Sequence, residues 1–342
     1  MSCLLSGTTM VPIGSPPSKR TMMRRPQRLQ VHSHLTSPEI RLTTKQQSHK
    51  SKVLFVLGAT TTGKTKLSID LAKHFDCEII SADKIHVYKG LDILTTKVPE
   101  NERQGIPHYL IDFVDPEADY YTPQDFRKDV HMAMDHIFGK GRIPIVAGGS
   151  NSYIEALVED PLFNFKAKFD TCFIWMDVDL PVLYRRASKR VEEMIDAGAL
   201  EEVREMFAPG IDYGRGVWRV IGAKELEPYF IAEANSADEA TKKMLLDSAM
   251  EDMKRNTCKL AEIQIGKIKR LRDELGWKLH RIDATPVFEE RGVVCMDMWM
   301  KAVLKPSMQI CSAFLNEGGS EEDEDREAEF FGVKQESLAT VL

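Results

Sequence analysis

The stretch that decides the fold is VLFVLGATTTGKT, residues 53–65. It opens with an uninterrupted apolar run, which is typical of a strand buried on both faces of a parallel sheet. Its second part, Gly58 to Thr65, fits the pattern GxxxxGK[ST] at every fixed position. A helix is expected from Lys64 to about Phe75. The match therefore lies between a strand and a helix, as a phosphate-binding P-loop requires.

Each part of this loop has a role in holding phosphate oxygens. The loop consists of Gly58, Ala59, Thr60, Thr61, Thr62, Gly63, Lys64 and Thr65. Its glycines let successive backbone N–H groups turn toward an anion, and the start of the following helix adds a favourable dipole. Lys64 supplies a positive charge, and the Thr65 hydroxyl can bind Mg²⁺. The motif indicates a phosphate or diphosphate ligand without identifying the molecule that carries it.

The residues after the loop alternate between strand and helix patterns. The expected strands are 78–82, 143–147 and 173–178, and the expected helices are 122–138, 152–158 and one opened by Asp179 and Pro181. Thr122 and Pro123 are a strong start signal for the helix at 122–138, because they supply an N-cap and a proline at the first helical position. This alternation predicts an α/β fold with a P-loop NTPase-like, doubly wound parallel sheet.

Composition changes along the chain predict five regions. These are a disordered leader at 1–50, a P-loop α/β core at 51–182, a mainly helical inserted subdomain at 183–276, a return to the core at 277–305, and an acidic disordered tail at 306–342. The return is expected to hold a last strand at 278–282 and a closing helix at 286–304. The 84–97 connection has no clear periodicity, and its length is typical of a functional loop.

The leader has the composition of an organellar transit peptide. Residues 1–50 carry eight basic residues and one acidic residue, a net charge of +7, so the remainder of the chain carries −13. The leader is rich in Arg, Ser and Thr and has no long apolar core, which excludes a secretory signal. We expect the protein to be located in the chloroplast or another plastid. If the basic leader is not a targeting signal, we expect a cytoplasmic location.

The composition of the whole chain gives two further indications. No apolar run is long enough for a membrane helix. The six cysteines are scattered along the chain, which indicates free thiols.

Several polar residues follow the expected strands, where the P-loop also opens. Asp83 comes directly after the strand at 78–82, and Ser150 follows Gly148 and Gly149 after the strand at 143–147. Because the carboxyl ends of parallel strands meet at one edge, both are candidates for the site. A helix-capping role explains Asp83 equally well, and a plain tight turn explains Gly148, Gly149 and Ser150 equally well.

The basic residues further along the chain have simple explanations. Taken alone, Arg219 and Lys224 are explained as surface cations. The basic residues of 242–272 are explained as a solvated helix face that also carries acidic residues.

Six segments together resemble the dimethylallyl (isopentenyl) transferases. They are GATTTGKT (58–65), IISADKIHVYKGLDILTTK (79–97), VAGGSNSY (146–153), WRVIGAKEL (218–226), NTCKLA (256–261) and WKLHRIDAT (277–285). Their order and spacing also match, over roughly residues 52 to 290. The last two segments resemble the plant adenylate branch, the cytokinin synthases.

The resemblance implies a specific reaction. The P-loop would hold the diphosphate of dimethylallyl diphosphate, and ATP, ADP or AMP would be the acceptor. The adenine N6 amine would attack C1 of the prenyl group, with Asp83 as the base and pyrophosphate as the leaving group. Lys64, the loop amides, Mg²⁺ at Thr65, Ser150 and Arg219 would spread the growing negative charge. Lys224 departs from the residues that several plant members of the family have at this position, and we expect it to bind the acceptor and to favour a more highly phosphorylated one.

Three alternatives remain open from the sequence. The first is transfer to tRNA, which some members of the family carry out. The net negative charge of the chain after residue 50 disfavours RNA binding. The C-terminal region also lacks the Cys and His residues of the zinc finger that eukaryotic tRNA enzymes often have. A P-loop kinase would use Asp83 to activate a hydroxyl for phosphoryl transfer. A nucleotide-dependent switch would need the 84–97 loop to change conformation with the γ-phosphate. The sequence does not indicate an oligomeric state.

Overall fold

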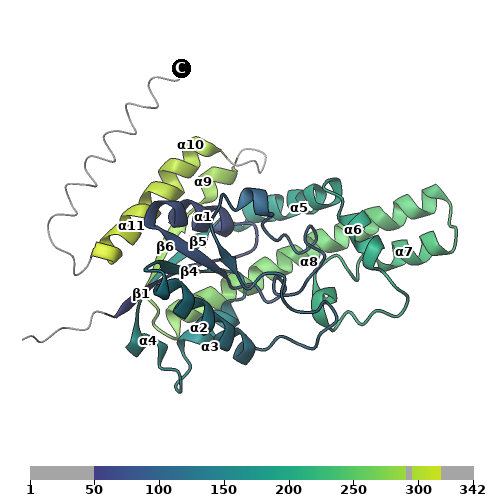
Figure 1. Ribbon diagram of the computed structural model, residues 1–342. Helices are drawn as coiled ribbons and strands as arrows, with labels where there is room; N and C mark the ends of the chain where they lie inside the picture. The colour runs from purple at the N-terminus through teal and green to yellow at the C-terminus, as the bar shows by residue number, and fades with distance from the viewer. Residues whose placement is uncertain (1–49, 290–294, 317–342) are drawn as a thin grey trace, which may run out of the picture. The chain divides into compact units, whose positions relative to one another are not determined.

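The computed structural model describes residues 50–289 and 295–316 (Figure 1). Almost all of the predicted leader and the acidic residues of the predicted tail, 321–325, lie outside these ranges. Within them, every helix is either too short or too polar to cross a membrane.

Six parallel strands form one sheet in the order β3-β2-β4-β1-β5-β6. They are β1 (Ser51–Gly58), β2 (Cys77–Ser81), β3 (His108–Tyr109), β4 (Ile143–Gly148), β5 (Phe169–Asp177) and β6 (Leu279–Asp283). The predicted parallel α/β sheet is therefore confirmed. Only β3 was not expected, because two residues carry no periodic signal. The chain leaves β1 toward β2 on one side and returns to β5 on the other, which makes the carboxyl end of β1 the switch point at which such sheets bind ligands.

Strand β1 separates two apolar cores. Val53, Phe55 and Leu57 belong to one cluster and Leu54 and Val56 to the other, and all five are fully buried. Since successive strand side chains point to opposite faces, burial on both faces accounts for the uninterrupted apolar run.

Helices cover both faces of the sheet (Figure 1). One cluster includes side chains from α2 (Pro123–Gly139), α3 (Asn151–Val158) and α4 (Phe165–Lys168), and the other includes side chains from α1 (Lys64–Phe75) and α5 (Leu180–Asp196). The predicted cap of α2 is present as a capping box: the Thr122 hydroxyl accepts from the Asp125 N–H at 3.1 Å, and the Asp125 carboxylate accepts from the Thr122 N–H at 2.9 Å. This reciprocal pair fixes where the helix begins.

Between residues 183 and 276 the described chain forms helices and turns and no strand. After α5 they form α6 (Ala199–Met206), the 3₁₀ turn η2 (Gly216–Arg219), α7 (Glu227–Ala234) and α8 (Glu239–Asp273). Figure 1 shows α7 and the first half of α8 extending away from the sheet. The second half of α8 packs on it: Ile268 and Leu271 join one core cluster, and Ala261 and Ile265 join the other.

The C-terminal region differs from the expectation. In place of one helix at 286–304, the described residues form α9 (Thr285–Phe288), α10 (Met296–Met298) and a π-helical turn η3 (Trp299–Leu304). A further helix, α11 (Lys305–Asn316), follows without a break, so the predicted disordered tail is wrong for residues 306–316. Its buried Cys311 lies in a core cluster, against which Ile310 and Phe314 also pack. This apolar face accounts for the helix, because its burial favours folding.

Candidate active site

The P-loop joins β1 to α1 through a left-handed turn. Gly63 has a φ of 90°, a conformation that glycine adopts without strain. A Cβ at Gly63 would lie 2.9 Å from the buried Trp299 ring. The loop therefore requires glycine here for both its conformation and its packing against η3. The Thr65 side chain is exposed in the first turn of α1, where a ligand can reach its hydroxyl.

The threonines of the loop have separate structural roles. The Thr62 hydroxyl is buried and donates to the Ala59 carbonyl at 2.9 Å. A Cβ at Gly58 would lie 2.7 Å from this hydroxyl oxygen, so a side chain at that position would displace it. Thr61 has a φ of 64°, and its buried hydroxyl has no hydrogen-bond partner among the described residues. The backbone N–H of Thr60 donates to the side-chain carbonyl of Gln264 on α8 at 2.7 Å.

Lys64 lies back over the loop, where its Nζ donates to the Ala59 carbonyl at 2.5 Å. Burial lowers the pKa of its ammonium group to about 8; the nearby Asp83 carboxylate opposes this shift, whereas the Arg190 guanidinium adds to it. Lys64 is half-buried, and among the described residues its ammonium group donates to one carbonyl only; such a cation gains stability from an anion in the loop. Lys64 thus has the environment of a phosphate ligand.

Asp83 and Ser150 are brought together at the carboxyl edge of β2 and β4. The Asp83 carboxylate accepts from the Ile85 N–H at 3.0 Å, and the Ser150 hydroxyl accepts from the Lys84 N–H at 3.0 Å. The Ser150 N–H donates to the Ala82 carbonyl at 3.0 Å. A local turn thus orients the carboxylate, and Ser150 does not cap α3 with its side chain.

Arg219, at the end of η2, reaches the same edge from the helical region. Its guanidinium lies 4.3 Å from the centre of the Tyr120 ring, and its buried Nη1 has no partner among the described residues. Burial lowers the pKa of the Lys84 ammonium, and Arg219 adds to this effect, while Asp83 and Tyr120 oppose it. Arg219, Lys84 and Asp83 are therefore electrostatic neighbours, and Arg219 has a donor available for a ligand.

Lys224 is not brought into this group. Its side chain is exposed in the turns after η2, and no described contact joins it to the P-loop or to Asp83.

Sequence patterns missed three neighbours of the site: Lys84, Tyr120 and Gln264. Neither Lys84 nor Tyr120 stands out in the sequence, because both lie in connections without periodicity. Gln264 does leave a signal: it is a polar residue within the buried stripe of α8, which comprises Ala261, Gln264, Ile265, Ile268 and Leu271. A polar side chain in such a stripe needs hydrogen-bond partners.

The described residues contain no group of three or more His, Cys, Asp or Glu side chains that could hold a metal ion. Mg²⁺ often takes only one or two ligands from a protein and the rest from phosphate and water. The exposed Thr65 hydroxyl beside the loop fits a site of that kind. The described residues do not provide the ligand group that a structural zinc site needs.

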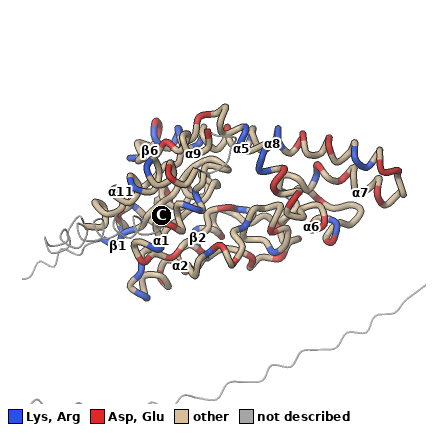
Figure 2. The backbone as a smooth tube through the Cα atoms, turned by 90° about the horizontal axis from the view of Figure 1, so that it is seen from above, with Lys and Arg blue, Asp and Glu red and all other residues tan. Residues whose placement is uncertain are grey.

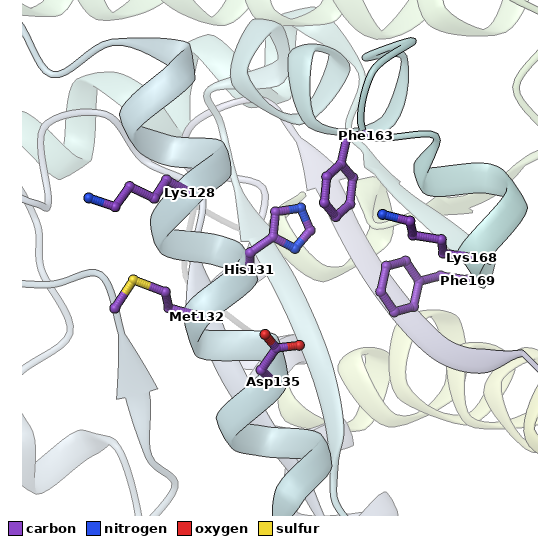
Figure 3. Close-up of a pocket in the computed structure, with 7 residues that line it drawn as sticks. All are labelled: Lys128, His131, Met132, Asp135, Phe163, Lys168 and Phe169. Atoms are coloured by element: carbon purple, nitrogen blue, oxygen red, sulfur yellow. The ribbon is translucent and has the colours of Figure 1, made fainter. Parts of the chain in front are cut away.

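A separate pocket of about 570 Å³ lies on α2 and at the beginning of β5 (Figure 3). His131, Phe163 and Phe169 line it together with Lys128, Met132, Asp135 and Lys168. Burial lowers the pKa of His131 to about 4, so the ring is neutral near pH 7. Since β5 begins at the opposite edge of the sheet from the P-loop, this pocket is not part of the candidate active site.

A P-loop after the first strand of a parallel sheet, with a carboxylate and several cations at the same edge, defines a P-loop α/β protein, a class in which this loop holds phosphate groups. The family model described as IPP transferase matches residues 86–168 and 161–270. Adenylate isopentenyltransferase 5, chloroplastic, of Arabidopsis thaliana is 45% identical over 78% of this chain and 81% of its own length. The chain belongs to the IPP transferase family of prenyltransferases.

Other relatives cover similar shares of the chain. Adenylate isopentenyltransferase 7, mitochondrial, of Arabidopsis thaliana is 46% identical over 81% of this chain and 84% of its own. The adenylate isopentenyltransferase of Humulus lupulus is 38% identical over 77% and 90%. Among solved structures, a eukaryotic dimethylallyltransferase acting on tRNA has a TM-score of 0.65 and 26% identity, over 78% of this chain and 80% of that chain.

Proposed function

We propose that this enzyme transfers the dimethylallyl group of dimethylallyl diphosphate to N6 of ATP, ADP or AMP and releases pyrophosphate. The observation that carries the proposal is the meeting of the P-loop, Asp83 and Arg219 at one edge of the sheet, in a chain up to 46% identical to enzymes named adenylate isopentenyltransferases. The product would be an isopentenyl-adenine nucleotide, a cytokinin precursor.

In this reaction the N6 lone pair forms a bond to C1 of the prenyl group while the bond from C1 to the diphosphate oxygen breaks. The Asp83 carboxylate takes the N6 proton, which makes a weak aryl amine an effective nucleophile. The P-loop amides and Lys64 hold the leaving diphosphate, and Ser150 and the free Nη1 of Arg219 complete its contacts. The Ile85 N–H holds the Asp83 carboxylate in place and the Lys84 N–H holds the Ser150 hydroxyl, whereas Lys64 exchanges its contact with the Ala59 carbonyl for the diphosphate.

We further propose that Mg²⁺ binds beside the loop, with Thr65 as the protein ligand and phosphate oxygens and water as the others. When bound, it would neutralise charge on the diphosphate. For the cellular location we propose a plastid. The supporting observations are the basic, acid-poor leader and relatives named chloroplastic, although one relative is named mitochondrial.

The second candidate is transfer to tRNA, which the structural relatives favour, since one is described as acting on tRNA. Two observations favour free nucleotides over tRNA as the acceptor. The adenylate isopentenyltransferases are more similar in sequence, at up to 46% against 26% identity. The backbone of α8 carries acidic as well as basic residues (Figure 2), whereas RNA binding usually requires a broad basic surface.

The first test separates prenyl transfer from a kinase reaction. Purified protein is incubated with ATP and dimethylallyl diphosphate, and the products are separated by chromatography. We expect prenylated ATP with all three phosphates intact, together with pyrophosphate. Release of ADP that depends on a third, hydroxyl-bearing substrate would instead indicate phosphoryl transfer and contradict the proposal.

A further inference from the structure

Gln264 connects three parts of the active site that are remote from one another in the sequence. Its side-chain carbonyl accepts from the Thr60 N–H in the P-loop at 2.7 Å, and its Nε2 donates to the Gly149 carbonyl at 3.1 Å. Its own backbone carbonyl accepts from the Asn151 side-chain amide, at the start of α3, at 3.2 Å. One residue of α8 thus joins the loop after β1 to the turn after β4.

This arrangement is buried and tightly packed. Gln264 is only 8% exposed and Asn151 is 1% exposed, so water does not easily replace these hydrogen bonds. A Cβ at Gly149 would lie 2.4 Å from Gln264 Nε2. The φ of Gly149 is not in the left-handed region. It is therefore the approach of Gln264, and not backbone conformation, that opposes a side chain at position 149.

We propose that Gln264 is a positioning residue for the donor diphosphate. By holding the Thr60 amide and the Gly149 turn in a fixed relation, it sets the shape of the loop that grips the phosphates, without touching the substrate. The buried amide is suited to this role because it offers one acceptor and one donor at the same time. The inference rests on the proposed function only in naming the diphosphate as the ligand of the loop.

The test uses the full chain with inorganic pyrophosphate as the probe, measured by calorimetry. Gln264→Met keeps the side-chain length and removes both hydrogen bonds, so we expect pyrophosphate affinity to fall about 10-fold. In the prenyl-transfer assay, the KM for dimethylallyl diphosphate should rise while the KM for the nucleotide stays close to wild type.

The matched control is Ile268→Ala, which removes a fully buried side chain one turn further along α8. It should lower Tm and leave pyrophosphate affinity within about twofold of wild type, because Ile268 belongs to the apolar core and offers no hydrogen bond to the loop. Equal losses of affinity in Ile268→Ala and Gln264→Met would mean that general destabilisation is the cause, and would overturn the proposal. Wild-type affinity in Gln264→Met would do so as well.

A second variant tests the same contact from the other side. Gly149→Ala should displace Gln264 and reproduce the loss of pyrophosphate affinity. In a Gln264→Ala background the added methyl group finds open space, so Gly149→Ala should then cost little more; fully additive losses would contradict the coupling. If pyrophosphate binds but no nucleotide is prenylated, the proposed function fails and the role of Gln264 is still decided by these affinities.

Discussion

The Asp83 carboxylate lies close to several positively charged side chains. Lys64 and Lys84 both interact with it, and Arg219 interacts with Lys84. The surplus of positive charge suits a site that binds a polyanion, and the single carboxylate among them suits the removal of a proton. In an active site of this kind, changing the carboxylate affects the rate more than it affects binding.

Asp83→Asn is expected to lower kcat by about 10²- to 10⁴-fold, because the amide cannot take the N6 proton. The Asn side-chain carbonyl still accepts from the Ile85 N–H, so Tm should change little. Asp115→Asn is a matched control, since Asp115 makes the same kind of local contact, with the Glu117 N–H at 2.9 Å, in an exposed turn. Steady-state kinetics with ATP measures the effect. Near-normal turnover in Asp83→Asn would exclude Asp83 as the base.

Lys64 predicts a pH dependence of donor binding. Its pKa is about 8 in the free protein, so the ammonium is charged below that pH and increasingly neutral above it. A bound diphosphate favours the charged form and raises the pKa. Affinity for dimethylallyl diphosphate should therefore decrease as pH rises from 7.5 to about 10. The measurement compares wild type with Lys64→Arg, whose side chain stays charged, because the ratio of the two affinities cancels the ionisation of the ligand. A constant ratio over this range would contradict the assignment.

At the level of elements, sequence patterns predicted the helices and strands that have strong local signals. Helix α1 begins at Lys64 and ends at Phe75, as expected from the P-loop and the apolar spacing, and Thr122 caps α2. The two-residue strand β3 and the π-helical turn η3 have no comparable signal. For helix α11 the sequence predicts a disordered tail, because its apolar face precedes the Glu- and Asp-rich run by only a few residues.

The capping box of α2 predicts a measurable loss of stability. Thr122→Ala removes the hydroxyl that accepts from the Asp125 N–H and should lower the free energy of unfolding by about 0.5–2 kcal/mol. Thr122→Ser keeps the hydroxyl and should stay within about 0.5 kcal/mol of wild type. Urea unfolding followed by circular dichroism measures both variants. Equal stability of the Ala and Ser variants would show that the cap does not stabilise the helix.

At the level of the whole molecule, residues far apart in the sequence meet at one edge of one sheet. The P-loop, Asp83 and Ser150 follow three strands, and their meeting could be predicted because parallel strands share a carboxyl edge. Arg219 and Gln264 arrive from the helical region. Their positions depend on how η2 and α8 pack on the sheet, and a single sequence does not determine that packing. Lys224, which departs from the family pattern and was expected to bind the acceptor, is exposed and makes no described contact with the P-loop or Asp83.

The composition of the leader predicts the subcellular location of the protein. Residues 1–50 fused to a fluorescent protein should direct it to plastids in leaf cells, because a basic, acid-poor leader is typical of organellar import. A fusion with the leader's arginines replaced by glutamate serves as the control and should remain in the cytosol. Co-localisation with a mitochondrial dye, or a diffuse cytosolic signal from the native leader, would contradict the plastid assignment.

The most direct test of the central claim is mass spectrometry of the products formed by the purified protein. ATP, ADP and AMP are each offered with dimethylallyl diphosphate, alongside a tRNA stem-loop that contains an accessible adenosine. Fragmentation locates the prenyl group on the product. We predict a prenyl group on N6 of a free nucleotide and at most trace modification of the RNA. Modification of the stem-loop alone, with all three nucleotides unchanged, would contradict the account.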